Sequence, residues 1–282
     1  MADENLARQA TDRHEPSVRL GSSFIGSLLI AACVAACGGR EPDAENVKRG
    51  EAAYELAVDA FKRNSMRESL AHVRRALQLD DESANAAYLG SLVMLVFCAD
   101  DASSPDCRYD EAENYVRRSL VLNPELRDAR NTLGVVLIHR GKAVEAIGVL
   151  EPLARDMLYQ SPEKSWGNLG WAYLEAGRAG EAIIALKRSV AAQPLFCVGH
   201  YRLGLAFEQQ HELEAARQAF TRAVGIEEGA CARLQDAFLG RGRVAKALGD
   251  TTEARKDFEH CRELAPSTTA GRACVAALLA AQ

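Results

Sequence analysis

The stretch EKSWGNLGWAYLEAGRAGEAIIALKRSVAAQP, from Glu163 to Pro194, decides the fold. Trp166, Leu169 and Tyr173 follow one another at the i, i+3, i+7 spacing of an amphipathic helix. Gly177 predicts the end of that helix, because glycine takes the left-handed conformation without a steric penalty. Small and large apolar residues then recur along a second helical segment that ends before a proline. The stretch therefore predicts two helices joined by a tight turn.

This helix pair has the tetratricopeptide-repeat pattern, in which W-x2-L-G-x2-Y is followed by A-x3-F and then by P. Gly170 lies in the first helix, where the absence of a side chain lets the second helix approach closely. Ala182, Leu186 and Ser189 provide the matching face of the second helix. One such pair cannot bury its own apolar face, so the pattern predicts stacked neighbours.

Further copies of the unit occur on both sides of this stretch. Leu133-Gly134 and Leu203-Gly204 mark the two neighbouring units, and the first unit is degenerate, as is usual for a terminal repeat. We predict an all-α protein, a right-handed superhelical solenoid over residues 49–282 in which the first helix of each pair lines the inner face. The repeats are expected at about 50–82, 83–126, 127–162, 163–196, 197–230 and 235–268, followed by a capping helix over 269–282.

Composition and charge limit the classes of function. The chain has 282 residues and a net charge of −5, and its basic residues are interspersed with acids, which argues against nucleic-acid binding. It has no phosphate-binding loop, nucleophile elbow or H-E-x-x-H motif, and its cysteine spacing suits no zinc site. We therefore expect no enzyme activity, no cofactor, no metal and no small-molecule substrate. Five histidines are expected on solvated helix surfaces: His72, His139, His200, His211 and His260.

The N-terminal residues 1–36 resemble a bacterial lipoprotein signal peptide. The run from Leu20 to Ala36 is apolar and rich in small residues, and at about 17 residues it is marginal for a membrane span. It leads into Val34-Ala35-Ala36-Cys37, which is similar to the lipobox whose cysteine is acylated. Cys33 is the alternative acylation site, because Ile30-Ala31-Ala32-Cys33 also fits the pattern.

The lipobox resemblance implies a mature chain that begins at Cys37, with residues 37–48 as a flexible tether. Gly38 follows the cysteine in place of the Asp that commonly retains lipoproteins at the inner membrane. We therefore expect lipid anchoring at the periplasmic face of the outer membrane. An uncleaved N-terminal membrane anchor is the alternative.

The remaining six cysteines fall into three pairs when they are placed on the repeat model. One pair brackets an insertion of about ten residues in the second unit, and a second pair lies 34 residues apart, at equivalent places of neighbouring units. The third pair joins a small-residue position of the last repeat to the capping helix. Buried free thiols are the alternative. The predicted disulfides are Cys98–Cys107, Cys197–Cys231 and Cys261–Cys274.

The first helices also carry inward positions that are not used for packing between helices. Rigid aromatic and aliphatic side chains in a concave surface are usual anchors for a protein partner, and an exposed stripe of them is unusual on a soluble monomer. The alternative is a tightly wound superhelix whose interior these side chains fill. The predicted partner-binding groove consists of Asn131, Val135, Ile138, Trp171, Leu174, Tyr201, Leu205 and Glu208.

The third and fourth units resemble the PilF/PilW/Tgl family of type IV pilus lipoproteins. The resemblance rests on NTLG (131–134), HRGKAVEAI (139–147) and ARDMLYQSPEKSWGNLGWAYLEAGRAGEA (154–182), with a two-residue overrun that contains Leu158-Tyr159. It implies a pilotin, an outer-membrane lipoprotein that binds secretin subunits and is needed for the secretin pore to assemble. The insertion between Cys98 and Cys107 and the additional cysteines depart from the family pattern.

Two other classes of function remain open. A general periplasmic scaffold or adaptor lipoprotein, not tied to pili, has the same sequence features and binds other envelope proteins. A cytoplasmic adaptor similar to a co-chaperone is the third possibility, and it requires that the apolar N-terminal segment is not a signal.

Overall fold

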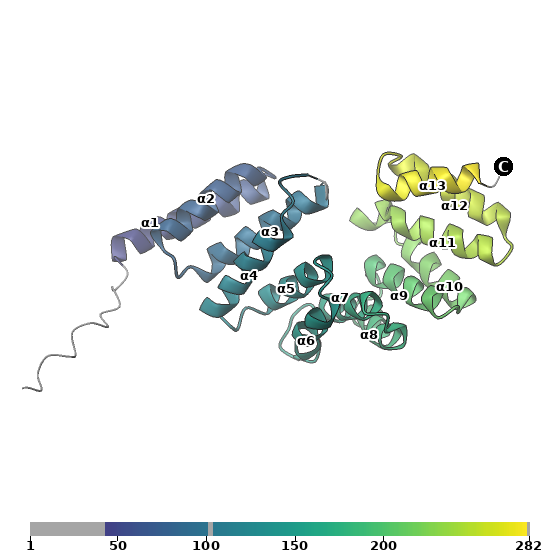
Figure 1. The fold of residues 1–282 in the computed structure, drawn as a ribbon, viewed down its shortest axis with the longest axis horizontal. Helices are drawn as coiled ribbons and strands as arrows, with labels where there is room; N and C mark the ends of the chain where they lie inside the picture. The colour runs from purple at the N-terminus through teal and green to yellow at the C-terminus, as the bar shows by residue number, and fades with distance from the viewer. Residues whose placement is uncertain (1–42, 101–103, 281–282) are drawn as a thin grey trace, which may run out of the picture. The chain divides into compact units, whose positions relative to one another are not determined.

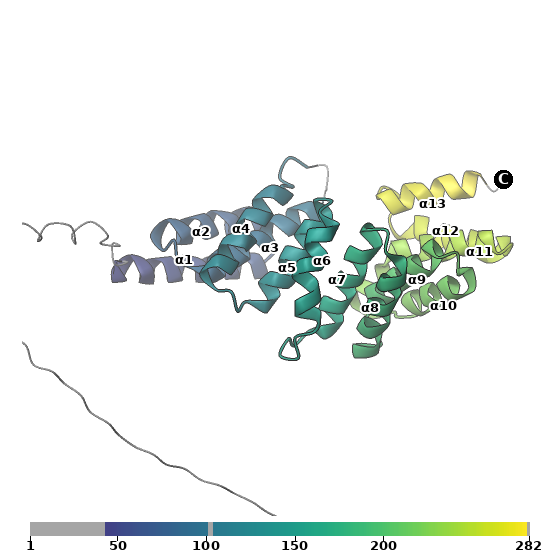
Figure 2. The same cartoon turned by 60° about the horizontal axis from the view of Figure 1, so that its bottom comes forward.

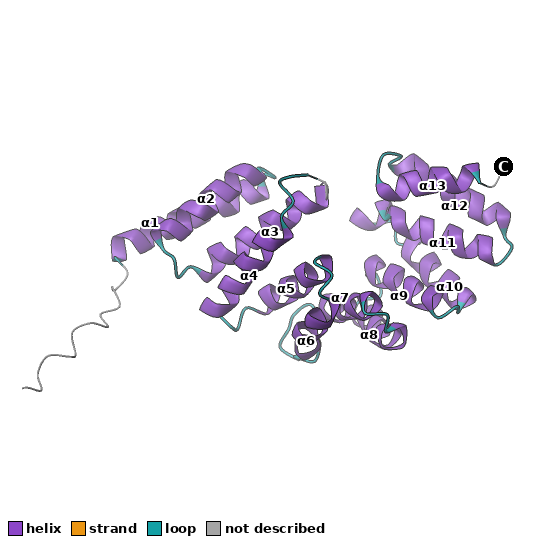
Figure 3. Ribbon diagram, viewed as in Figure 1, coloured by secondary structure: helices purple, strands orange, loops and turns teal. Residues whose placement is uncertain are grey.

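The computed structural model describes residues 43–100 and 104–280. In these two ranges every regular element is helical, and no strand occurs (Figure 3). The predicted all-α repeat fold is therefore confirmed. The signal peptide predicted over residues 1–36 and the acylation site predicted at Cys37 lie outside the described residues.

In the described ranges, six helix pairs and a final single helix follow one another, and one 3₁₀ helix precedes the sixth pair (Figure 1). Each helix packs against the next, and the first helix of each pair from α1 to α9 also contacts the first helix of the following pair. The pairs therefore stack in chain order (Figure 2). The helices are α1 Ala44–Lys62, α2 Met66–Leu79, α3 Ala84–Asp100, α4 Tyr109–Leu122, α5 Arg127–His139, α6 Ala143–Ala154, α7 Pro162–Glu175, α8 Ala179–Ala192, α9 Cys197–Gln209, α10 Leu213–Val224, η1 Gly229–Arg233, α11 Gln235–Ala247, α12 Thr251–Leu264 and α13 Thr269–Leu279.

The beginning of α1 corrects one prediction. Residues 44–48, which were expected to belong to the flexible tether, form the first turns of α1. Asp43 is the N-cap, since its side chain accepts a hydrogen bond of 3.1 Å from the backbone N–H of Glu45. A capping carboxylate and an acidic first turn both stabilise a helix N-terminus. No helix in the described ranges combines the length and the apolarity that crossing a membrane requires.

Glycines of the first helices allow each pair to pack closely. A Cβ atom at Gly170 would lie 2.4 Å from Leu186 Cγ in α8, and Gly134 has the same relation to Leu150 in α6. Phe220 fills the corresponding space against Gly204. The large residue of the second helix thus occupies the volume that the glycine leaves free, as the repeat pattern predicts.

In the described residues, the turn between the two helices of a pair uses a left-handed residue in the first, third, fourth, fifth and sixth pairs. Gly141, Gly177 and Gly249 have φ angles of 70°, 72° and 89°, respectively. Asn64 and His211 take the same conformation, with φ of 61° and 60°. Only Gly adopts this region without a steric cost, so the predicted end of the helix at Gly177 is explained, and His211 is an exception to the rule.

Each of the three predicted cysteine pairs is bonded in the structure. The Cα atoms are 4.4 Å apart for Cys98–Cys107, 5.8 Å for Cys197–Cys231 and 6.2 Å for Cys261–Cys274. These separations lie within the usual range for disulfides. The first bridge closes the insertion of the second unit, and the second joins α9 to η1, across the connection to the sixth pair.

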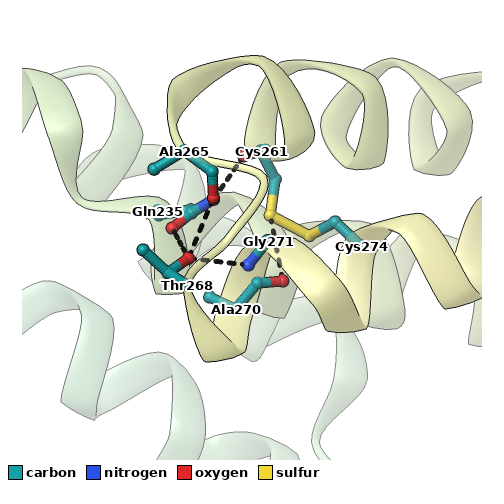
Figure 4. Close-up of a disulfide and its surroundings, with 7 residues drawn as sticks. All are labelled: Gln235, Cys261, Ala265, Thr268, Ala270, Gly271 and Cys274. Atoms are coloured by element: carbon teal, nitrogen blue, oxygen red, sulfur yellow. Dashed lines mark hydrogen bonds between the residues drawn. A yellow bond between two sulfur atoms is a disulfide. The ribbon is translucent and has the colours of Figure 1, made fainter.

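The third disulfide attaches the capping helix α13 to α12 (Figure 4). Beside it, the amide of Gln235 in α11 donates to the carbonyl of Ala265 at 2.8 Å and also contacts the carbonyl of Cys261. The Thr268 hydroxyl caps α13 by accepting from the N–H of Gly271 at 3.0 Å. Covalent and hydrogen bonds therefore hold the cap against the last repeat, where the stack would otherwise end in an apolar face.

Candidate protein-binding groove

Helices α7, α9 and α11 and the residue that precedes α11 line an open pocket with a volume of about 550 Å³. We call it the first-helix pocket, because all of its lining residues except Leu234 come from the first helices of the fourth, fifth and sixth pairs. Its walls combine aliphatic and aromatic side chains with two arginines and two glutamates. The lining residues are Trp171, Leu174, Glu175, Val198, Tyr201, Arg202, Leu205, Glu208, Gln209, Leu234 and Arg243.

Five of the eight predicted groove residues line this pocket, namely Trp171, Leu174, Tyr201, Leu205 and Glu208. All five are partly exposed. They come from two neighbouring first helices, α7 and α9. Within each helix they lie on one face, because residues at i, i+3 and i+4 share a helix face.

The other three predicted groove residues belong to α5 and do not line the pocket. The prediction for Ile138 is wrong: its side chain is 5% exposed and belongs to the hydrophobic core, since it lies on the side of α5 that packs against the neighbouring helices. Asn131 is half-buried, and its side-chain oxygen accepts a hydrogen bond of 3.0 Å from Asn168. Val135 is half-buried outside the pocket.

Trp171 is the residue with the most varied contacts in the pocket. The guanidinium of Arg202 lies over the indole at 4.4 Å from the ring centroid, a cation–π arrangement. The indole N–H donates to Glu175 at 3.1 Å, and His139 contacts the ring edge-on at a centroid distance of 5.0 Å. These contacts from three helices hold the indole in one orientation, as expected for a preorganised binding anchor.

An aromatic row extends from Trp171 toward the N-terminal pairs. Tyr109 of α4 stacks on His139 of α5 with ring centroids 4.7 Å apart, and His139 in turn meets Trp171 of α7. Desolvation, and then repulsion by Arg202, lowers the pKa of His139, so the imidazole is neutral at pH 7. The His139 side chain is exposed, as predicted, and it also contacts two aromatic rings.

The prediction of a solvated surface histidine is wrong for His200. Its side chain is buried, with 4% exposure, and Nε2 lies 2.9 Å from the carbonyl oxygen of Pro194. Because a carbonyl only accepts, Nε2 carries the proton of the neutral ring. His200 thus has a structural role in the turn before α9.

The two arginines of the pocket have different environments. Arg243 forms a two-pronged ion pair with Glu208, with Nε–Oε1 at 3.1 Å and Nη2–Oε2 at 2.7 Å. Arg202 donates from Nη1 to the carbonyl of Gly167 at 3.2 Å and to the side-chain oxygen of Asn168 at 2.9 Å, both neutral acceptors. Burial lowers the pKa of Arg202 to about 10, so it is still charged at pH 7.

The pocket has the chemistry of a recognition surface. Burial, and then the charge of Asp236, raises the pKa of Tyr201 to about 12, so its hydroxyl is protonated at pH 7. In the described part of the chain, no group of three or more His, Cys, Asp or Glu side chains is arranged to hold a metal ion. Apolar walls with a few fixed charges suit the binding of a protein segment.

The sequence analysis missed six residues of the pocket: Glu175, Val198, Arg202, Gln209, Leu234 and Arg243. Arg202 had a usable signal, because it stands directly before a Leu-Gly pair, as Asn168 and Thr132 do in the preceding units. Equivalent repeat positions occupy equivalent places along a stack of first helices, so the three form a row. Leu234 lies in the irregular connection before α11 and had no such signal.

Comparison with protein families identifies the class of protein. Models described as tetratricopeptide repeat match residues 108–156, 168–230 and 235–268. The chain therefore belongs to the tetratricopeptide-repeat proteins. These proteins mediate protein–protein interactions, and their repeat scaffolds are typically without catalytic activity. Comparison with curated protein sequences gives no significant match.

Solved structures with a similar fold include two type IV pilus proteins. PilW, described as a widely conserved type IV pilus biogenesis factor, is 21% identical with a TM-score of 0.67, and the match covers 81% of this chain and 99% of PilW. PilF of Pseudomonas aeruginosa is 18% identical with a TM-score of 0.62, over 83% of this chain and 99% of PilF. A tetratricopeptide repeat protein from Parabacteroides merdae is 12% identical with a TM-score of 0.64, over 82% and 84% of the two chains. At these identities the likeness is one of fold.

Proposed function

We propose that the protein is a lipoprotein of the outer membrane that acts as a pilotin, binding secretin subunits of a type IV pilus through the first-helix pocket. The observation that carries the proposal is the pocket itself, in which Trp171, Leu174, Tyr201 and Leu205 present apolar surface from two neighbouring repeats. Large aromatic side chains that are held rigidly are the residues that most often dominate protein–protein binding energy. The protein acts by positioning its partner and makes no covalent bond.

Three further observations support the pilus assignment. The similarity in fold covers 99% of PilW and 99% of PilF, and 81% and 83% of this chain, respectively. The overrun between the third and fourth pairs has a structural role, since Tyr159 is buried and its hydroxyl donates to Asp128 at 3.1 Å. The lipobox sequence before Cys37 supplies the membrane attachment that a pilotin requires. Several acyl chains, as on a mature bacterial lipoprotein, anchor a protein stably.

A deletion strain tests the pilus function. Loss of heat-resistant secretin multimers on deletion, restored by the full-length gene, is the expected result. Intact multimers and normal pili in the deletion strain would contradict the proposal. Incorporation of labelled palmitate, abolished by Cys37→Ala and unaffected by Cys33→Ala, tests the anchor separately.

The contribution of the pocket is tested with the two tryptophans of α7. Trp171→Ala is expected to weaken binding to the purified secretin at least about 10-fold, with a smaller effect on folding, because the indole lines the pocket. Trp166→Ala is the matched control: Trp166 is partly buried outside the pocket, with Arg188 of α8 over its ring at 4.6 Å. Surface plasmon resonance measures binding, and thermal denaturation measures folding. Equal losses of binding and stability for Trp171→Ala would mean that Trp171 is only a core residue.

A general envelope scaffold is the second candidate function. The observation in its favour is that the Parabacteroides merdae protein, which is described only as a tetratricopeptide repeat protein, has a TM-score of 0.64, between those of PilW and PilF. The similarity in fold therefore does not by itself distinguish a pilus protein from a general scaffold. This candidate predicts that deletion leaves secretin multimers intact, while affinity capture on wild-type protein and on Trp171→Ala identifies a different envelope protein that depends on Trp171.

A further inference from the structure

The connection between α6 and α7 holds two large apolar side chains in solvent. Met157 is 96% exposed and Leu158 is 67% exposed, although the helices on both sides are well packed. In Figure 2 this connection lies at the lower edge of the stack. Single exposed apolar residues are common on proteins, but two adjacent ones at the tip of a connection form a continuous apolar surface. The tip is therefore a candidate contact surface.

Hydrogen bonds fix the tip in this exposed position. The carboxylate of Asp156 accepts from the backbone N–H of Leu158 at 2.9 Å and from Nε of Arg127 at 2.6 Å. Tyr159, directly after the tip, is buried, and its hydroxyl donates to Asp128 at 3.1 Å. Residues on both sides of the tip are thus attached to α5. The tip cannot fold back onto the core without breaking these bonds.

The two neighbouring connections continue this apolar surface. Val121, in the last turn of α4, is 81% exposed, and Leu195, between α8 and α9, is 57% exposed. Because the pairs stack in chain order, the α4–α5, α6–α7 and α8–α9 connections follow one another along one edge of the stack. We call Val121, Met157, Leu158 and Leu195 the apolar edge.

The start of α1 belongs to the same edge of the stack. The two helices of a pair are antiparallel, so each first helix begins on the edge where the second helices end. The predicted acylation site, Cys37, precedes the N-cap Asp43 by six residues. Six residues span at most about 20 Å, whatever their conformation. Acyl chains on Cys37 therefore keep the start of α1, and with it this edge, close to the bilayer.

Basic side chains flank the apolar tip. Arg155 at the end of α6 and Lys164 in the first turn of α7 are both exposed. Of the acids nearby, Asp156 is paired with Arg127, and Glu163 is partly buried. Apolar side chains with basic neighbours are typical of protein surfaces that lie in the interface of a bilayer with anionic lipids.

We propose that the apolar edge inserts into the surface of the membrane to which the protein is anchored, with Met157 and Leu158 in contact with lipid. This inference rests on the proposed lipoprotein function and adds a second point of membrane contact. An anchor on a short tether limits the distance from the bilayer, whereas a second contact selects one orientation. Helix α7 follows the tip directly and carries Trp171 into the first-helix pocket. The contact therefore fixes the orientation of the pocket relative to the membrane.

Fluorescent labels on single introduced cysteines test the contact. The lipidated protein, expressed from the full-length gene, is placed in vesicles of phosphatidylethanolamine and phosphatidylglycerol. Met157→Cys, Leu195→Cys or Val144→Cys then carries a nitrobenzoxadiazole group. Val144 is the matched control, because it is 79% exposed but lies at the start of α6, near the opposite edge. Labelling is selective, since the six cysteines of the described chain are in disulfides and Cys37 is acylated.

The emission of the labels at positions 157 and 195 should shift to the blue and be quenched by lipids that carry a nitroxide on the acyl chain. The label at position 144 should emit as it does in water. Met157→Asp with Leu158→Asp should remove most of the quenching at position 195, because burial of each of these side chains favours the inserted state about 10-fold. Val144→Asp should leave that quenching unchanged. Thermal denaturation should show little change for either variant, since all three side chains are exposed.

The inference is overturned if the label at position 157 emits as in water, or if it is quenched no more than the label at position 144. A blue shift without quenching by the nitroxide lipids also overturns it, because the label is then buried in a protein contact, such as one with a second copy of the chain. Absence of palmitate overturns the anchor and this inference together. The pilus function is judged separately by secretin multimers in the deletion strain. An acylated protein that restores multimers but has a solvent-exposed label at position 157 therefore refutes this inference alone.

Discussion

At the scale of single residues, the repeat depends on where glycine is required and where it is not. Gly170 in α7 faces Leu186 so closely that an added methyl group would overlap the leucine side chain. Gly148 in α6 is exposed and has no neighbouring atom within 4 Å of the position that a Cβ would take. The same substitution should therefore have opposite effects at the two positions.

Gly170→Ala is expected to lower the free energy of unfolding by about 1–3 kcal/mol, because the core around Leu186 has to shift to accept the methyl group. Gly148→Ala is expected to raise it by about 0.5–1 kcal/mol, since alanine favours the helix and meets open space. Urea denaturation followed by circular dichroism measures both. A neutral Gly170→Ala variant would show that α7 and α8 are less tightly packed than the structure indicates.

At the scale of elements, the turns between paired helices differ in the residue that takes the left-handed conformation. Three of these turns place Gly at the left-handed position, whereas the fifth pair places His211 there with φ of 60°. A side chain in this conformation costs free energy that glycine avoids. The His211 side chain is exposed, so little packing offsets that cost.

His211→Gly should accordingly raise the free energy of unfolding by about 0.5–1 kcal/mol, after allowing for the greater freedom of glycine in the unfolded chain. The reverse exchange, Gly177→His, should lower it by a similar amount, because a Cβ at Gly177 meets nothing within 4 Å and only the backbone conformation is strained. The denaturant concentration at the midpoint of unfolding, measured for each variant, compares the two substitutions. If His211→Gly is destabilising, the imidazole makes a stabilising contact in solution.

At the scale of the whole molecule, a stack of helix pairs is held together mainly by contacts between neighbours. The connection between the fifth and sixth pairs is longer than most and contains η1. Cys197–Cys231 spans this connection with a sequence separation of 34 residues. The disulfide therefore reinforces the connection at the wall of the first-helix pocket, next to Val198.

Replacing this pair, as Cys197→Ala with Cys231→Ser, should cost about 3–4 kcal/mol by the chain-entropy estimate. Because coupling is between neighbours, hydrogen exchange should accelerate in α11, α12 and α13 and remain unchanged in α1 and α2. Cys98→Ala with Cys107→Ala is the control, whose effect should stay near α3 and α4. Uniform acceleration over all helices in both variants would indicate that the stack unfolds as one cooperative unit.

The sequence alone predicted the repeat and its disulfides, because both depend on residue spacings within one or two repeats. The spacing of Trp166, Leu169 and Tyr173 defines a helix face without reference to the rest of the chain. A repeat period also places Cys197 near Cys231 once the stacking is known. The start of α1 was missed because one capping side chain, Asp43, decides it.

The binding surface was predicted less completely, because it depends on the rotation of each helix against its neighbours. Leu174 and Ile138 occupy the same position of their repeats, five residues after the Leu of the Leu-Gly pair, yet Leu174 lines the pocket and Ile138 is in the core. Arg202 could be placed on the first-helix face from its repeat position. The repeat position did not show that Arg202 has no carboxylate partner among the described residues.

The sequence by itself determined that this chain forms paired helices, where most of them begin and end, and which cysteines can meet, since periodicity and chain spacing act over one or two repeats. Only the tertiary structure decided which side chains share a pocket and which charges remain uncompensated. The physical reason is that burial and charge pairing depend on atoms brought together from three separate helix pairs, and no local pattern encodes their distances.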